Sequence, residues 1–251
     1  MNKVKHLFLV LLLVMAQLPL SATNIELSWS FNQGDAKALQ GTVSEEGLFS
    51  YATSSLGSDL EFLGTNKAGS LTVTKVQPKV KASNNGDGNA ISFSLKTKKG
   101  LSLSVKSFSF DACKLGTNGG SIDVVAEAGG KSYELLKDES PQNAKNDPYF
   151  THYKADLSQI PATEGEWVIK VFVKNVAINK QYGFANFAIS ATTEGKVEQV
   201  NSYSLSASLA DAKAGSIKVS PTGDIFDEGT SVTLTATENF GYHFEKWIDG
   251  E

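Results

Sequence analysis

Arginine is absent from this sequence of 251 residues, so all 23 of its basic side chains are lysines. The planar guanidinium group makes the bidentate contacts by which proteins commonly recognise phosphates and nucleic-acid bases. The lysines are scattered among acidic residues and form no basic stripe, and the formal net charge at pH 7 is -4. We therefore expect no nucleic-acid partner.

Cysteine and histidine are also scarce. Cys113 is the only cysteine, which excludes an internal disulfide, and its neighbours Phe108 and Phe110 favour a small core residue over a reactive thiol. Beyond the N-terminal segment the histidines are His152 and His243, which together with Cys113 fall short of the about four ligands of a zinc site. No HExxH motif, nucleophile elbow or phosphate-binding glycine loop occurs. We expect no resident cofactor and no catalytic residue here.

The N-terminal segment has the layout of a secretory signal peptide. Lys3 and Lys5 precede an apolar run over 7–20, and the small residue Ala22 follows. The sequence therefore predicts a signal peptide over 1–22 and a mature chain that is secreted or held at the cell surface. Because the apolar run is shorter than the roughly 20 residues of a spanning helix, we expect no membrane span after signal removal. Export without disulfides suits a bacterial envelope.

Alternation of apolar and polar side chains dominates the mature chain. The stretches "ISFSLKTK" at 91–98 and "LSLSV" at 101–105 alternate with a period of two, which is typical of half-buried strands. In "VKSFSF" the apolar phase slips by one residue. Because such a slip would turn every later side chain to the other face, we predict a β-bulge or a strand boundary at Lys106 and Ser107.

Further strand segments are separated by turns rich in Gly, Asn, Asp and Pro, such as "GTNGG", "AGGKS" and "PQNAKNDP". They lie at Ile122–Ala126, Tyr133–Leu136, Trp167–Val173 and Phe184–Ala191, after "IELSWSF", "GLFSYA" and "SLTVTKV". No long helical period occurs. The sequence therefore predicts an all-β fold: an antiparallel β-sandwich over 24–195, a polar linker over 196–202, and a small β-rich unit over 203–251.

One stretch gathers residues suited to a ligand cleft. "NDPYFTHYKADL" contains Tyr149, Phe150, His152 and Tyr153, a mixture of flat rings and polar groups that is found in ligand clefts. An ordinary strand explains the same residues, with Tyr149, Thr151 and Tyr153 on one face and Phe150 and His152 on the other. The four residues are our candidates for a ligand-binding site.

Acidic residues offer two weaker hypotheses of catalysis. Asp123, Glu127, Asp138 and Glu139 could pair for glycoside hydrolysis, but we expect Asp123 on a solvated strand face and Asp138 and Glu139 in a turn. A triad of His152, Asp156 and a serine is also conceivable, but in an exposed loop such a composition is coincidental.

A loop and two tryptophans complete the candidate residues. In "SNNGDGNA", Asn85, Asp87 and Asn89 could hold calcium, although a turn explains them better. Trp167 begins an almost continuously apolar stretch and is expected in the core, and Trp247 is expected to pack inside the C-terminal unit.

The C-terminal unit resembles the internalin-type B repeat, also called the divergent bacterial repeat. The resemblance lies in "GSIKVSP" and in "DEGTSVTLTATENFGYHFEKWIDGE". Copies in that family usually continue with a polar loop and a last strand, so the resemblance implies a sequence cut within a repeat and a longer parent protein. We also expect the last strand segment to be loosely packed.

The preceding sandwich resembles the N-terminal module of exported bacterial proteins of the pectate-lyase and pectinesterase type, which is similar to galactose-binding-like jelly rolls. "SFSFDACKLGTNGGSIDVVAE" and "NKQYGFANFAISATTEG" show the resemblance. It implies a non-catalytic accessory and spacer portion of a polysaccharide-degrading protein, with a polysaccharide or a cell-surface glycan as partner. Pectate lyases generally use an arginine base, so that chemistry is not expected here. The alternative is an adhesion protein with a binding sandwich and stalk repeats.

Overall fold

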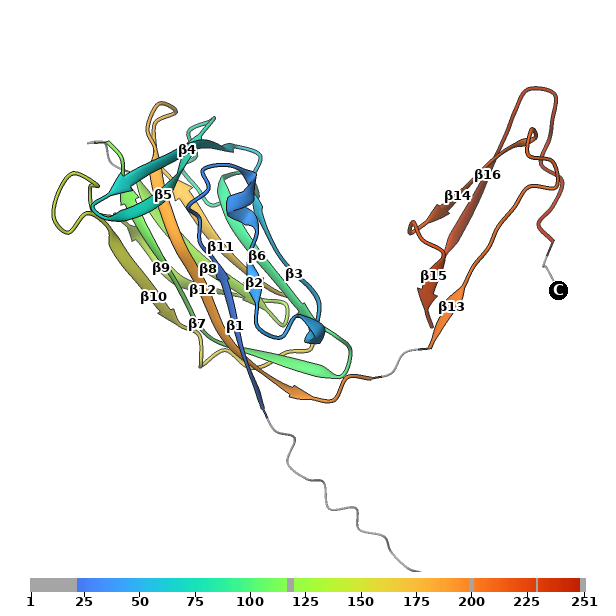
Figure 1. The fold of residues 1–251 in the computed structure, drawn as a ribbon, viewed down its shortest axis with the longest axis horizontal. Coiled ribbons are helices and arrows are strands. Elements are labelled where there is room, and N and C mark those ends of the chain that lie inside the picture. Colours follow the sequence, from blue (N-terminus) through green and yellow to red (C-terminus); the bar gives the residue numbers. More distant parts are fainter. Residues whose placement is uncertain (1–21, 117–119, 199–200, 229, 249–251) are drawn as a thin grey trace, which may run out of the picture. The chain divides into compact units, whose positions relative to one another are not determined.

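The computed structural model describes residues 22–116, 120–198, 201–228 and 230–248 (Figure 1). The signal peptide predicted over 1–22 lies outside the described residues except for Ala22, and the predicted linker lies partly outside them. The described residues form two compact units, which divide between Val197 and Glu198. Within the described part of the chain, no helix is long and apolar enough to cross a membrane.

The first unit is built from two antiparallel sheets. The large sheet contains β1 (Thr23–Trp29), β2 (Thr42–Val43), β4 (Leu60–Ala68), β5 (Leu71–Pro78), β7 (Leu101–Lys114), β10 (Thr151–Asp156) and β12 (Tyr182–Gly195). The small sheet contains β3 (Phe49–Leu56), β6 (Ala90–Thr97), β8 (Ser121–Ala128), β9 (Lys131–Glu139) and β11 (Trp167–Lys174). Three short 3-10 turns lie between them: η1 (Ala36–Leu39), η2 (Glu46–Leu48) and η3 (Asp87–Asn89).

The order of the strands defines a wound sandwich of the jelly-roll type. The large sheet runs β10-β7-β12-β1-β2, with β5 paired to β12 and β4 paired to β5, and the small sheet runs β3-β6-β11-β8-β9. From β5 onward the chain changes sheet at every connection except the β8–β9 hairpin (Figure 1). The predicted all-β class and antiparallel sandwich are confirmed.

The predicted bulge lies at Lys106. On β7, Val105 pairs with Ala191 and Ser107 pairs with Ser190 of β12, so Lys106 is an extra residue in the ladder. Lys106 is exposed, while Val105 and Phe108 on either side of the slip are both buried. The bulge thus keeps the apolar side chains of a 14-residue strand on the core face.

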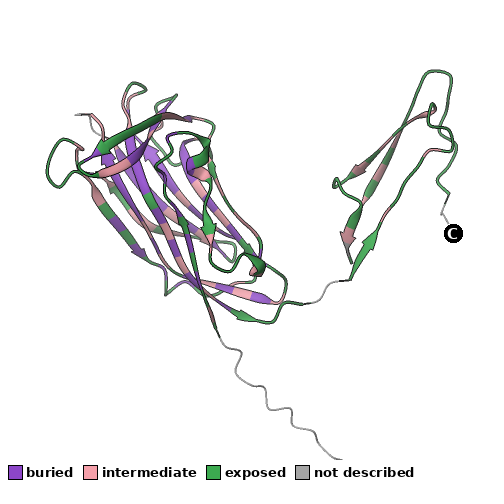
Figure 2. Cartoon of the chain, viewed as in Figure 1, coloured by how far each residue is buried: buried purple, intermediate pink, exposed green. Residues whose placement is uncertain are grey.

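Buried and less buried residues alternate along the strands of the two sheets (Figure 2). Many of the largest buried side chains are aromatic. The rings of Trp29 and Phe93 meet edge to face at 4.7 Å between centroids, and Phe93 lies 4.9 Å from Phe187. Trp167 is fully buried, as predicted, and its indole Nε1 donates a hydrogen bond of 3.1 Å to the Leu103 carbonyl. Full burial of each such side chain contributes about 1.5–3 kcal/mol, so this aromatic core accounts for much of the stability of the sandwich.

Cys113 is buried, as predicted, but not among the rings of the main core. It points to the outer side of the large sheet, where it forms a small cluster with Ala68, Val73 and Ala185. Phe108 and Phe110 point into the main core because they occupy the opposite phase of β7. Burial raises the pKa of the Cys113 thiol to about 11, and only a backbone hydrogen bond from Gly183 opposes this.

The second unit consists of two strand pairs. β13 (Ser202–Ser204) pairs with β15 (Ile225–Asp227), and β14 (Gly215–Ser220) pairs with β16 (Thr233–Glu238). The predicted packing of Trp247 inside this unit is wrong: its side chain is 48% exposed, and its ring contact is with Phe244 at 5.2 Å. The apolar side chains over 240–248 are exposed, in agreement with the predicted loose packing.

Candidate functional site

The four predicted ligand residues lie at the start of β10 and divide between its two faces. Tyr153 points inward, is buried, and stacks on Phe110 with 5.2 Å between ring centroids. Burial raises the pKa of Tyr153 to about 12. His152 and Phe150 belong to the outer face, as the alternating strand pattern requires. Tyr153 therefore supports the site from the core side, while its neighbours face outward.

Tyr149 and Phe150 pack on the tip of the β4–β5 hairpin. Phe150 covers the small cluster around Cys113. Tyr149 lies over Gly69, where a side chain would clash because an added Cβ would stand 2.6 Å from the tyrosine Cδ2. Gly69 also has a φ of +61°, a conformation that glycine adopts at little cost. Tyr149 stays 40% exposed and presents part of its ring to solvent.

His152 is the centre of a polar cluster on the outer face of the large sheet. Its Nδ1 lies 2.8 Å from Oδ1 of Asp111, which faces it across the β7–β10 ladder. The second carboxylate oxygen of Asp111 accepts a hydrogen bond of 2.7 Å from the Asn186 side chain on β12. The Asp111 side chain is only 8% exposed, whereas that of His152 is 58% exposed. We call these three residues the carboxylate–imidazole–amide cluster.

The geometry of the cluster fixes the roles of its atoms. The Asp111 carboxylate accepts a hydrogen bond from Nδ1 of His152. The neutral imidazole therefore carries its proton on Nδ1 and offers Nε2 as an acceptor. Asn186 stands at an irregularity of β12, between Ala185 and Ala188, and its φ of +52° turns its side chain toward Asp111. The cluster thus presents an oriented imidazole edge and an amide to solvent.

The cluster corrects the triad considered from the sequence. His152 lies in a strand rather than in an exposed loop, and its acidic partner is Asp111 rather than Asp156. Asp156 instead accepts a hydrogen bond of 2.9 Å from the backbone N–H of Ser158. Among the described residues, no serine or threonine hydroxyl is bonded to His152. The triad of His152, Asp156 and a serine is therefore not formed among the described residues.

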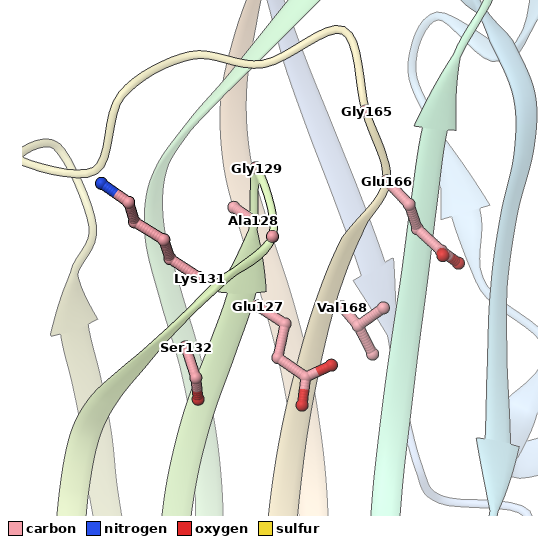
Figure 3. A pocket seen from close by; sticks show the side chains of 9 residues that line it. Glu127, Ala128, Gly129, Lys131, Ser132, Gly165, Glu166 and Val168 are labelled. Atoms are coloured by element: carbon pink, nitrogen blue, oxygen red, sulfur yellow. The ribbon is translucent and has the colours of Figure 1, made fainter.

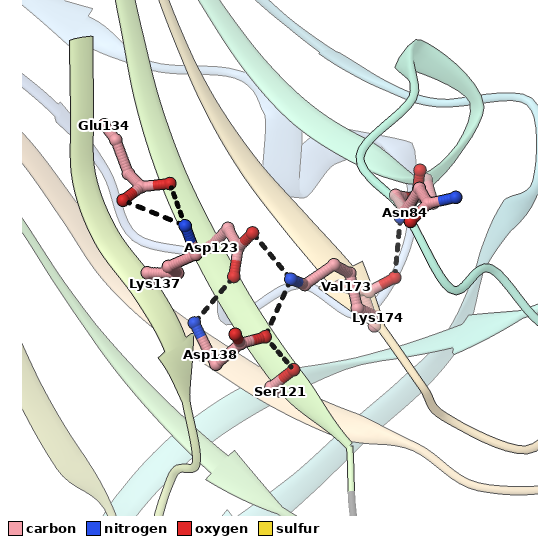
Figure 4. A network of polar contacts seen from close by, with 9 residues as sticks. Asn84, Ser121, Asp123, Glu134, Lys137, Asp138, Val173 and Lys174 are labelled. Atoms are coloured by element: carbon pink, nitrogen blue, oxygen red, sulfur yellow. Dashed lines mark hydrogen bonds and ion pairs between the residues drawn. The ribbon is translucent and has the colours of Figure 1, made fainter.

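The predicted position of Asp123 on a solvated strand face is wrong. Its side chain is 5% exposed and meets Nζ of Lys174 at 2.6 Å on the outer side of the small sheet (Figure 4). The same ammonium contacts Asp138 at 2.8 Å, and the N–H of Asp138 donates to Asp123 at 2.7 Å. Asp138 and Glu139 belong to β9 rather than to a turn, and Asp138 has a φ of +51°. A bulge between Ile122 and Val124 brings Asp138 opposite Asp123.

Opposing effects set the pKa values in this group. Burial lowers the pKa of Lys174, but hydrogen bonds and charges from Asp123 and Asp138 outweigh it and hold that pKa above its ordinary value. The hydrogen bond to Lys174 holds the pKa of Asp138 below its ordinary value. The two carboxylates belong to an ion cluster that ties β8, β9 and β11 together.

The loop considered for calcium is occupied by contacts within the protein. Asn89 is buried and donates a hydrogen bond of 2.9 Å to the Val173 carbonyl. Asp87 pairs with Lys170 at 3.0 Å, and Asn85 is exposed. Across the described ranges, no group of three or more His, Cys, Asp and Glu residues could hold a metal ion.

A shallow pocket of about 440 Å³ lies on the outer side of the small sheet. It is bounded by the β8–β9 turn and by the segment that enters β11 (Figure 3). Glu127 and Ser132 face each other across the β8–β9 ladder, Val168 forms part of the floor, and Glu166 and Lys131 stand at the rim. Glu127 was among the acidic residues considered for glycoside hydrolysis from the sequence, but no sequence pattern indicated this pocket.

The first unit is thus a jelly-roll sandwich with polar groups arranged on both outer faces. Residues 205–251 match the family model described as the divergent InlB B-repeat domain, which supports the resemblance of the second unit. No curated protein matches the chain.

Three solved structures are similar to the sandwich at low identity. The CBM22-1 xylan-binding domain of Xyn10C from Paenibacillus barcinonensis has 12% identity and a TM-score of 0.36, covering 65% of this chain and 92% of that one. TmCBM61, solved with β-1,4-galactotriose, has 14% identity and a TM-score of 0.32, covering 58% and 91%. A family two carbohydrate esterase from Cellvibrio japonicus has 9% identity and a TM-score of 0.26, covering 60% and 36%. A functional proposal for this chain therefore rests on the geometry of its own site.

Proposed function

We propose that the sandwich is a non-catalytic carbohydrate-binding module and that the C-terminal repeat is a spacer. In this proposal the chain is the exported N-terminal portion of a bacterial polysaccharide-degrading protein, with pectin among the substrates of the parent. The observation that supports binding is the carboxylate–imidazole–amide cluster on the large sheet, and Tyr149, three residues before His152 in the chain, is partly exposed.

The chemistry of the cluster suits sugar hydroxyls. A hydroxyl can donate to one group and accept from another, and the cluster offers the Nε2 acceptor of His152 and the amide of Asn186 side by side. Asp111 holds both groups, so little side-chain entropy remains to be lost when a ligand binds. Tyr149 adds a flat apolar surface that can cover a sugar ring.

Binding of oligosaccharides to the whole chain tests this function. Isothermal titration with neutral and acidic oligosaccharides should find at least one ligand, and His152→Ala and Tyr149→Ala should each raise its Kd about tenfold. Lys154→Ala is the matched control, because Lys154 lies two residues beyond His152 on the same outward face of β10. If no oligosaccharide binds, or if the control weakens binding as much as His152→Ala, the proposal is wrong.

A further inference from the structure

The outer face of the small sheet carries a continuous row of mostly small side chains, in which the ion pair of Glu127 with Lys170 is the contact made within the described residues. Strand register places five outward residues side by side across β9, β8, β11, β6 and β3. In that order they are Ser132, Glu127, Val168, Ser94 and Thr53. We call them the cross-strand row. Five strands about 4.8 Å apart give it a length of about 19 Å.

A second row runs parallel to it, one step along the strands. It consists of Glu134, Val125, Lys170, Ser92 and Ser55. Their neighbours in sequence point into the core, so the alternation of the strands places both rows on the outside. The residues are small apart from Glu134 and Lys170, and they leave a face of low relief.

The hydroxyl groups on this face are available to a ligand. Within the described part of the chain, the side chains of Ser132, Ser94, Thr53, Ser92 and Ser55 make no hydrogen bond to the protein. By contrast, Ser54 points the other way and donates to the Leu39 carbonyl at 2.7 Å. Free hydroxyls at regular intervals along a flat surface match the regularly spaced hydroxyls of an extended sugar polymer.

The charges on this face are mostly balanced by one another. Lys170 is held by Glu127 at 2.9 Å and by Asp87 at 3.0 Å. Glu166 accepts a hydrogen bond from the hydroxyl of Tyr51, and this bond is the main cause that raises the pKa of Tyr51. Lys96 on β6 and Lys131 in the pocket are also exposed on this face, but the pocket carries the two carboxylates of Glu127 and Glu166 against one lysine. Because Lys170 is already paired, an anionic polymer gains no net attraction in the pocket. The chemistry favours a neutral ligand.

We infer that the cross-strand row and the adjoining pocket bind a neutral, extended polysaccharide chain that lies across the strands of the small sheet. The pocket at the β8–β9 turn takes a sugar unit at one end of the row, where the carboxylates of Glu127 and Glu166 accept bonds from its hydroxyls. The other end of the row is Thr53 on β3, and Tyr51 lies two residues before it on the same strand. The hydroxyl of Tyr51 is bonded to Glu166. This site rests on the proposed glycan-binding function and lies on the sheet opposite the carboxylate–imidazole–amide cluster.

Blocking variants of the whole chain test the inference. Ser94→Trp obstructs the middle of the row and Ser132→Trp fills the pocket, and tryptophan is well tolerated at outward strand positions. Thr192→Trp is the matched control, because Thr192 is an outward residue of the large sheet on β12. Equal urea midpoints for the three variants and the parent establish that the sandwich is intact.

Titration with neutral xylo-, gluco- and β-1,4-galacto-oligosaccharides of increasing length, and with oligogalacturonate, gives the readout. We expect affinity for a neutral series to rise with length, and Ser94→Trp and Ser132→Trp to raise Kd about tenfold while Thr192→Trp does not. If the chain binds but only His152→Ala weakens binding, the second site is wrong and the proposed function stands. A preference for oligogalacturonate that survives both blocking variants also overturns it. If no oligosaccharide binds, the proposed function fails and the second site fails with it.

Discussion

Replacement of Lys174 by methionine should destabilise the sandwich by more than any exposed charge change. Lys174 lies on β11 with a side chain 9% exposed, and its ammonium is paired with Asp123, which is 5% exposed. Methionine keeps the length of the side chain but removes the charge. Asp123 then stays buried with the N–H of Asp138, at 2.7 Å, as its remaining hydrogen bond from the group.

The cost follows from the burial of the pair. Removal of one partner of a buried ion pair typically costs about 3–5 kcal/mol, because the other charge is left without compensation. The partly exposed side chain of Asp138 lets water approach the group, so we expect the lower end, about 3 kcal/mol. This corresponds to a rise of about a hundredfold in the unfolding equilibrium constant. In Asp123→Asn/Lys174→Met the buried charge is gone as well, and the loss should fall to about half.

Urea denaturation, followed by the fluorescence of the buried Trp29 and Trp167, measures these changes in the whole chain. Lys137→Met is the control, since Lys137 pairs with Glu134 at 3.0 Å while both side chains are more than half exposed. The control should leave the midpoint unchanged. If Lys174→Met costs no more than Lys137→Met, or if the double variant is as unstable as the single one, the argument from the buried charge is refuted.

Three further predictions concern single residues. Asp138→Asn should lower stability by an amount that is constant between about pH 5 and 8, begins to shrink near pH 4, and is lost as pH falls further through the folded pKa, which lies below the ordinary value; a difference that grows on acidification would contradict this. Cys113 should react with a disulfide reagent at pH 8 only as fast as the chain unfolds, because burial raises its pKa to about 11, and rapid labelling of the folded chain would contradict the packing. Gly183→Ala should cost about 1–3 kcal/mol in urea denaturation, because an added Cβ would meet Val73 and would lie 2.8 Å from Sγ of Cys113, and an unchanged midpoint would show that this cluster yields easily.

The alternation of side chains was sufficient to predict most strands, because each strand of a two-sheet sandwich has one buried face. The phase slip before Phe108 even located the bulge at Lys106. β4 was not among the predicted strands. Its ladder with β5 is irregular between Phe62 and Thr65, and its middle residues are exposed. The alternation of apolar and polar side chains is therefore interrupted in the middle of this strand.

The polar clusters could not be predicted, because they depend on register between strands that are far apart in sequence. Asp111 stands in the run "FSFDAC", and an acid among apolar residues on the outward phase is a signal of a partner. The identity of that partner follows only from the pairing of His152 with Asp111 across β7 and β10. In the same way, Asp123 appeared solvated because nothing in its own segment indicates that Lys174 covers it.

The filled interior decides where this sandwich can recognise a ligand. Rings from both sheets meet at 4.7–4.9 Å between Trp29, Phe93 and Phe187, so the space between the sheets admits no sugar. In the proposed binding module, recognition therefore uses outward side chains, and on the strands the spacing of these side chains is set by the sheet. The two outer faces differ in how they use this spacing. On the large sheet one carboxylate orients two neighbouring polar groups at a single point, which suits a local contact. On the small sheet free hydroxyls repeat from strand to strand, which suits a chain longer than one sugar, and the dependence of affinity on ligand length separates the two arrangements.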